Sequence, residues 1–136
     1  MSKIRLDHVG IAVNSLDEGV KFWKLLGLVT EGDDEINLEQ GVNIRFLSTQ
    51  QGNPPRLELL SPTTSDTPVG KFIDTRGQGV QQLAFEVNDL QATINKLIES
   101  GIEMIDKIPN QGADGTKIAF VHPKSTGGVL VELLEK

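Results

Sequence analysis

The sequence predicts an α+β protein in which two tandem β-α-β-β-β modules form a cupped, mixed sheet. The main observation behind this prediction is an internal repeat. The stretch LDHVGIAVNSL at 6–16 aligns without a gap with VQQLAFEVNDL at 80–90. The same offset relates the tripeptide Glu-Leu-Leu at 58–60 to its second copy at 132–134. A register that holds from the first strand to the last indicates one structural module that occurs twice.

The second observation is that each copy begins with an alternating strand and continues with a helix. The strands are expected at Leu6–Val13 and Gln81–Val87. Gly27 and Gly101 stand where a helix end favours a residue with positive φ. The candidate N-caps are Ser15 or Asp17 in the first copy and Asn88 or Asp89 in the second. Apolar residues recur at helical spacing at Val20, Trp23 and Leu26, and again at Ile94, Leu97 and Ile98.

Three further short strands, separated by turn residues, complete each copy. They are expected at Leu28–Glu31, Ile44–Thr49 and Arg56–Leu60, then at Glu103–Ile108, Lys117–His122 and Gly128–Leu134. The repeats therefore cover about 4–62 and 78–136, joined by 63–77, within a single domain over 1–136. In the joining stretch, the amphipathic segment Val69–Asp74 predicts one or two helical turns.

Composition and charge narrow the class of protein. A chain of 136 residues is the size of one domain with a real core. The net charge of −6 argues against nucleic acid as the main partner. The absence of cysteine excludes disulfides, thiolate zinc sites and cysteine nucleophiles, and it fits a cytoplasmic location. No apolar run approaches a membrane span, and the start MSKIRLDH lacks the apolar core of a signal peptide, so neither a membrane nor secretion is expected.

Four polar residues are expected to meet, because equivalent residues of two repeats converge near a pseudo-twofold axis. These residues are His8, Glu58, Gln82 and Glu132. Alternation places His8 on the same strand face as Gly10 and Ala12. A carboxylate between apolar neighbours is costly unless it is paired or metal-bound. From the residues alone, two interpretations stay open: a metal site, or a buried histidine bonded to backbone with edge-strand glutamates in water.

Several segments together resemble a known family. They are DHVGIAV at 7–13, EQGV at 39–42, LELLSP at 57–62, KFIDTRGQGVQQLAFEVNDL at 71–90 and KIAFVHPKSTGGVLVELLE at 117–135. The chain resembles the vicinal oxygen chelate (glyoxalase/bleomycin resistance) superfamily and, within it, the methylmalonyl-CoA epimerase family. The resemblance covers essentially the whole chain, and the tail is its most specific element. It implies the vicinal oxygen chelate fold.

The resemblance also implies a divalent metal, with cobalt, manganese, nickel, zinc and magnesium as candidates. By position its ligands are His8, Glu58, Gln82 and Glu132. The family usually has two histidines where this chain has Gln81–Gln82, and the second of them is the ligand. An amide oxygen binds hard or borderline cations but is a poorer ligand than imidazole for zinc and copper. Glyoxalase I enzymes of eukaryotes use the same ligand types with the halves exchanged. The alternative is that the metal site has been lost and Gln82 is a polar strand residue.

By resemblance, the expected activity is epimerisation of methylmalonyl-CoA through loss of the C2 proton and an enolate. Epimerisation needs a base on each face of the reacting carbon. Glu132 is the first candidate, and Glu58 or a bound water is the candidate for the second. Some bacterial members carry a glutamate where this chain has Ile44. Lys124 and His122, in the loop that borders the pocket in this family, are candidates for binding the substrate carboxylate or CoA phosphate, although Lys124 also fits a plain surface lysine.

Two other functions remain open from the sequence. One is a glyoxalase I-like isomerase (lactoylglutathione lyase) acting on a thiol hemithioacetal, which the ligand types favour. The other is a metal-free module that binds a small molecule. Extradiol dioxygenase chemistry is disfavoured because it requires two histidines, and His8 alone stands in register. An acyl-CoA is the expected small-molecule partner, and a symmetric homodimer is the expected assembly.

Overall fold

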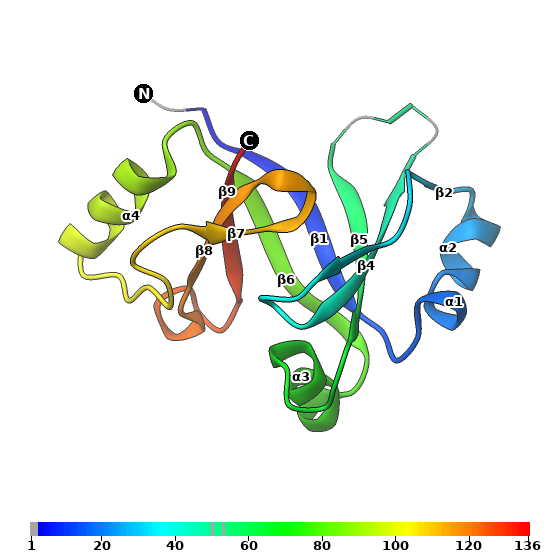
Figure 1. Cartoon of the computed structure of the whole chain (residues 1–136). Coiled ribbons are helices and arrows are strands. Elements are labelled where there is room, and N and C mark those ends of the chain that lie inside the picture. The colour runs from blue at the N-terminus through cyan, green and yellow to red at the C-terminus, as the bar shows by residue number, and fades with distance from the viewer. Residues whose placement is uncertain (1–2, 50, 53) are drawn as a thin grey trace. The chain divides into compact units, whose positions relative to one another are not determined.

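The structure is a computed structural model that describes residues 3–49, 51–52 and 54–136. Its helices and strands form two compact units (Figure 1). The N-terminal unit is His8–Gln81, and the C-terminal unit joins Gln82–Lys136 to the residues up to Asp7. Within the described residues, no helix is long and apolar enough to cross a membrane.

The N-terminal unit contains the strand order β2-β4-β5-β1. β2 pairs with the end of β4, and β3 pairs with its beginning. β1 and β5 are parallel, whereas β2, β3 and β5 pair with β4 in the antiparallel sense. The bounds are β1 Arg5–Ala12, α1 Leu16–Gly19, α2 Lys21–Leu26, β2 Val29–Thr30, β3 Glu35–Asn37, β4 Val42–Ser48, β5 Arg56–Pro62 and α3 Pro68–Arg76. The chain passes from β1 through two short helices before it returns to the sheet (Figure 1).

Local signals account for where these helices begin and end. Ser15 caps α1 by accepting a hydrogen bond from the backbone N–H of Glu18 at 3.2 Å. Gly27 ends α2 in the left-handed region at φ 119°, as its position in the sequence predicted. Thr67 caps α3, so this helix extends beyond the predicted segment Val69–Asp74 at both ends.

The two faces of the sheet in the N-terminal unit have different roles. One face packs against the helices, and its buried cluster is Ile11, Val13, Val20, Leu47 and Leu59. Side chains alternate between the faces of a strand, so the neighbours of these residues point to the other face. Gly10 lies directly opposite Glu58, and Glu58 lies directly opposite Phe46. The second face therefore carries His8 and Glu58.

The C-terminal unit repeats this plan with the strand order β6-β9-β8-β7. β6 and β9 are parallel, and β8 pairs antiparallel with both β9 and β7. The bounds are β6 Gly79–Glu86, α4 Leu90–Glu99, β7 Asn110–Gln111, β8 Lys117–Val121 and β9 Val131–Glu135, with 3-10 turns η1 at Ala113–Gly115 and η2 at Pro123–Ser125. Asp89 caps α4, and Gly101 has a positive φ of 87° just beyond it. The main buried cluster is Val87, Leu90, Ile94, Met104, Ala119, Val121 and Leu133.

The strand predicted at Glu103–Ile108 is wrong. Met104 makes an isolated bridge to Val121, and the chain then bends away. The side chain of Asp106 accepts a hydrogen bond from the backbone N–H of Phe120 at 2.9 Å, which replaces a ladder bond between strands. Two short strands were missed, β3 and β7, because segments of only three and two residues are too short to show a strand periodicity.

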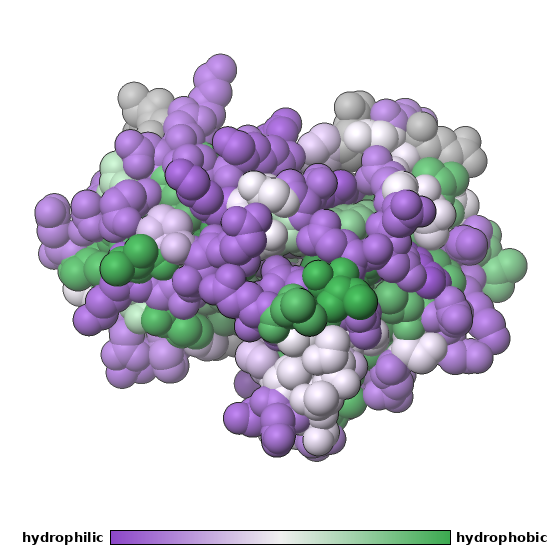
Figure 2. Space-filling view, viewed as in Figure 1, coloured by the Kyte–Doolittle hydropathy of each residue, from purple (hydrophilic) through white to green (hydrophobic). Residues whose placement is uncertain are grey.

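The helical spacing of Val20, Trp23 and Leu26 led us to expect that all three side chains are buried, which is more burial than the structure shows. Leu26 is exposed, as are its neighbours Phe22 and Leu25, whereas Val20 is buried. Phe22 contacts Trp23 edge to face, with ring centroids 5.1 Å apart. The space-filling view shows a largely hydrophilic face on which apolar side chains form separate patches (Figure 2). Helical spacing therefore identified the element but not how much of it is covered.

Core packing of α4 leads to a stability prediction. Ile94 is fully buried among the apolar residues of the C-terminal unit, whereas Ile98 on the same helix is 40% exposed. Ile94→Ala is expected to lower the free energy of unfolding by about 2–5 kcal/mol, because it leaves a cavity. Urea unfolding with Ile98→Ala as the matched control measures this. Equal losses in the two variants would contradict the packing described here.

Candidate metal and acid-base site

The first polar pair of the candidate site lies in the N-terminal unit. His8 is on β1 and Glu58 on β5, and both side chains are buried on the same sheet face. Nδ1 of His8 lies 3.1 Å from Oε2 of Glu58. The parallel register produces this contact, because Gly10, two residues beyond His8, is the residue directly opposite Glu58. The buried carboxylate thus has a nearby imidazole, as its desolvation requires.

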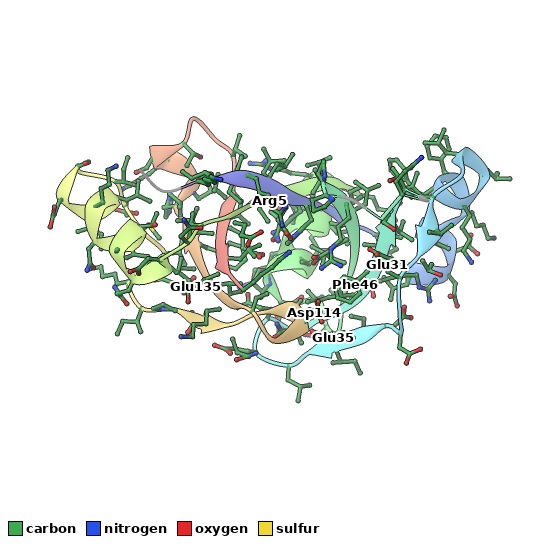
Figure 3. The ribbon with its side chains drawn as sticks, turned by 90° about the horizontal axis from the view of Figure 1, so that it is seen from above. Arg5, Glu31, Glu35, Phe46, Asp114 and Glu135 are labelled. Carbon is green, nitrogen blue, oxygen red and sulfur yellow. The ribbon has the colours of Figure 1, made fainter. Side chains whose placement is uncertain are left out.

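Arg56 joins this pair, although sequence reasoning had assigned it no role at the site. It lies directly opposite His8 on β5. Its Nη2 is 3.9 Å from Oε2 of Glu58, and its Nη1 is 3.6 Å from Oε1 of Glu31. The guanidinium lies over the ring of Phe46, 4.9 Å from the centroid (Figure 3 labels Glu31 and Phe46). The sequence could have indicated Arg56, because it lies two residues before Glu58 on one strand and therefore shares its face.

The second polar pair lies in the C-terminal unit at equivalent positions. Ala84 is directly opposite Glu132, as Gly10 is opposite Glu58 in the other repeat. Nε2 of Gln82 donates a buried hydrogen bond of 2.7 Å to Oε1 of Glu132. An ionised carboxylate only accepts, so this contact fixes the orientation of the amide. The amide oxygen of Gln82, which is the atom that could bind a metal, is then directed away from Glu132.

Burial raises the pKa of the Glu132 carboxyl from its ordinary value of 4.5 to about 7. The hydrogen bond from Gln82 opposes this rise, and the negative charge of Asp7 adds to it. Asp7 is a buried carboxylate that sequence reasoning missed, and it lies 2.9 Å from Nζ of Lys136. The sequence does contain a clue to Asp7, because it is an acidic residue within the largely apolar first strand and directly precedes His8. Glu132 is therefore an acid that titrates near neutral pH.

The two residues predicted to bind substrate have local partners. Nζ of Lys124 lies 2.9 Å from Oε1 of Glu103, and Nε2 of His122 lies 3.7 Å from Oε2 of the same residue. Nδ1 of His122 also accepts a hydrogen bond from the backbone N–H of Lys124. The hydrogen bond from Lys124 lowers the pKa of Glu103, and the nearby positive charges lower it further. These contacts shape the turn η2, and binding of substrate by the two residues stays a prediction.

The donor set fits a divalent cation. His8 and Glu58 are buried and lie close enough together to hold one ion between them. In the other unit, the second pair offers an amide oxygen and a carboxylate oxygen, which are donor types that hard or borderline divalent metals accept. The binding of one ion by both pairs together stays a prediction, as does the identity of the metal.

Comparison with known proteins identifies the superfamily and the family to which the chain is similar. Residues 7–120 match the Glyoxalase/Bleomycin resistance protein/Dioxygenase superfamily. The uncharacterized protein YqjC of Bacillus subtilis is 42% identical over 96% of this chain and 91% of its own length. Human mitochondrial methylmalonyl-CoA epimerase is 34% identical over 95% of this chain and 72% of its own length. The crystal structure of the Mycobacterium tuberculosis methylmalonyl-CoA epimerase has a TM-score of 0.89 and 38% identity, covering 96% of this chain and 86% of that one.

These matches confirm the predicted fold class, the glyoxalase fold of two β-α-β-β-β modules with a mixed sheet. The chain belongs to the methylmalonyl-CoA epimerase family of this superfamily, a family of isomerases.

The raised pKa of Glu132 leads to a prediction on stability. Between pH 4.5 and about 7 the folded protein binds more protons at this carboxyl than the unfolded chain does, so its stability falls as the pH rises. In metal-free protein, Glu132→Gln is expected to remove this contribution, making the variant more stable than wild type at pH 8 by up to about 3 kcal/mol. At pH 4 the two proteins are expected to differ much less.

Urea unfolding of chelator-treated protein from pH 4 to pH 8 measures the effect. Glu99→Gln, which alters an exposed carboxylate on α4, is the matched control. A difference between wild type and Glu132→Gln that stays constant across this range would show that burial does not raise the pKa of Glu132.

Proposed function

We propose that this chain interconverts the epimers of methylmalonyl-CoA by moving the proton on C2, with a divalent metal bound by His8, Glu58, Gln82 and Glu132. The epimerases among its relatives support the substrate. The observation that carries the chemistry is the buried Gln82–Glu132 pair, in which a hydrogen bond holds a carboxylate of raised pKa in one orientation. Proton transfer is most efficient when the pKa of the catalytic group lies near the working pH.

Glu132 is the group that takes the C2 proton in this proposal. Its burial excludes water and makes the ionised form more basic, while the N–H of Gln82 prevents rotation of the carboxylate. A bound divalent metal supplies the positive charge that polarises the thioester carbonyl and makes the C2 proton more acidic. The proton lost to Glu132 leaves an enolate of the thioester, and a proton delivered to the other face of C2 gives the opposite epimer.

Glu58 is the candidate for the second acid-base group. It is the equivalent of Glu132 in the other repeat, and its carboxylate lies near both His8 and Arg56. The position where some bacterial relatives have a glutamate is buried Ile44 here, on the same face of the sheet as Glu58. A buried aliphatic residue cannot transfer a proton, so the second acid-base group in this proposal is Glu58 or a water bound beside it. A homodimer and a cytoplasmic location also stay predictions.

The first test is exchange of the C2 proton of methylmalonyl-CoA with deuterated solvent, followed by mass spectrometry. Chelator-treated protein is supplied with cobalt, manganese or nickel, and wild type is expected to exchange with at least one. Glu132→Gln is expected to lower the rate about 100-fold or more, because it removes the general base. Glu99→Gln is expected to retain wild-type exchange. Absence of exchange in wild type under all three metals would overturn the proposal.

The second test concerns Gln82 as a metal ligand. Gln82→His replaces an amide oxygen by imidazole and is expected to tighten binding of cobalt or zinc about 10-fold or more, since even supporting groups of a metal site change affinity by that amount. Titration calorimetry on chelator-treated protein measures this. Gln81→His, at the adjacent residue of the alternating strand, is the matched control. Unchanged affinity in Gln82→His would show that Gln82 does not contact the metal.

The donor set also suits a glyoxalase I-like reaction, because that chemistry likewise removes a proton from carbon and returns a proton to carbon. The combination of one histidine, one glutamine and two glutamates favours this second candidate. Turnover of methylglyoxal with a cellular thiol, in the absence of methylmalonyl-CoA exchange, would replace the epimerase proposal by this one.

A further inference from the structure

We propose that the outer face of helix α2 is the surface on which two copies of this chain form a symmetric dimer. The inference concerns assembly and does not rest on the proposed activity. The face consists of Phe22, Leu25 and Leu26, which are spaced three and four residues apart and therefore share one side of the helix. These three side chains are called the α2 stripe below.

The α2 stripe is apolar and open to solvent. Phe22 and Leu26 are each 62% exposed, and Leu25 is 88% exposed. The other side of α2 already packs on the core, where Trp23 contacts the buried cluster that includes Val20. A helix with apolar residues on both sides is normally covered on both sides. Adjacent exposed apolar side chains of this kind mark an interaction surface, whereas single ones are ordinary.

The second repeat shows that the fold does not require this apolar face. At the repeat offset, the three positions of the α2 stripe correspond to Lys96, Glu99 and Ser100. Val20, which faces the core, corresponds to Ile94, which is also buried in a core cluster. The core-facing position is thus apolar in both repeats, while the outer positions are apolar only in the first. A contact outside the module therefore accounts for the α2 stripe.

The α2 stripe has the properties of an interface centre. The ring of Phe22 contacts Trp23 edge to face, with centroids 5.1 Å apart, and Trp23 is packed on the core. Rigidly held aromatic side chains are favourable at the centre of an interface. A stable dimer buries about 800 Å² per copy, which is about a tenth of this chain's surface of 7838 Å². The α2 stripe supplies the apolar centre, and the charged residues around it supply the polar rim.

The charges on α1 and α2 indicate a second copy as the partner. The two helices follow one another closely (Figure 1), and their exposed charges change sign along the chain. Asp17 and Glu18 lie in α1, whereas Lys21 and Lys24 lie in α2. When two such segments pack antiparallel about a two-fold axis, the acidic part of each lies beside the basic part of the other. A partner of uniform charge would be repelled by one of the two helices. The surface is therefore complementary to itself.

The first test measures self-association of the full chain by sedimentation velocity over a dilution series. Wild type is expected to form a dimer that dissociates on dilution. Leu25→Glu introduces the residue type that α4 has at the equivalent position, so the variant is expected to keep its fold, as circular dichroism would show. It is expected to weaken self-association about 30-fold or more, the effect of losing a central interface contact. Leu38→Glu, at a leucine of the same unit that is 87% exposed, is the matched control and is expected to associate as wild type does.

The second test asks whether the partner is a second copy. Glu18→Lys and Lys24→Glu each place like charges opposite one another, and each is expected to weaken self-association roughly 3- to 10-fold. An equal mixture of the two variants is expected to form a mixed dimer with nearly wild-type affinity, because both contacts then join opposite charges. Net charge alone predicts another result, since Glu18→Lys brings the acidic chain closer to neutrality and would strengthen its association.

A wild type that stays monomeric throughout the dilution series would overturn the inference. Equal weakening in Leu25→Glu and Leu38→Glu would do so too, because it would show that the α2 stripe is not the contact. A mixture of Glu18→Lys and Lys24→Glu that fails to recover the affinity would exclude the antiparallel contact between two copies. Recovery in the mixture, together with selective loss in Leu25→Glu, would support the proposed dimer.

Discussion

The site depends on one constraint, which is the cost of burying a carboxylate. Glu58 and Glu132 occupy equivalent positions of the two repeats, each on the last long strand and each buried on a sheet face. Neither carboxylate can stay ionised there without a partner. The parallel pairs β1–β5 and β6–β9 supply that partner. Gly10 lies opposite Glu58, and Ala84 lies opposite Glu132. The side chains two residues earlier, His8 and Gln82, therefore reach the two carboxylates.

The two repeats meet this constraint with different charges. Around Glu58 there are an imidazole and a guanidinium, both able to carry positive charge. Around Glu132, burial and the negative charge of Asp7 raise the pKa of the carboxyl to about 7, although the hydrogen bond from the neutral amide of Gln82 lowers it. A duplicated fold has thus acquired two unlike acid-base environments. In the proposed function, this difference is what suits Glu132 to act as a base near neutral pH.

Much of the fold followed from short-range signals in the sequence. The repeat, the alternating strands, Ser15 and Asp89 as caps and Gly27 as a helix end all act locally, and the structure contains each of them. The failures share a physical cause. Strands β3 and β7 are only three and two residues long and form through pairing with β4 and β8. Residues 103–108 do not form a strand, since Asp106 bonds to the backbone of Phe120. Burial of a helix face likewise depends on what covers it, which the exposure of Leu26 illustrates.

The sequence by itself determined the family, the duplicated module and the identity of the four polar residues, because all of these follow from residue type, spacing and register along the chain. Only the tertiary structure decided how those residues are paired within each unit and what charge surrounds them. It revealed Arg56 and Asp7 at the two pairs, and it placed His122 and Lys124 beside Glu103. These results depend on side chains from separate strands. The distance between two such side chains, and how far folding removes them from water, cannot be read from their order along the chain.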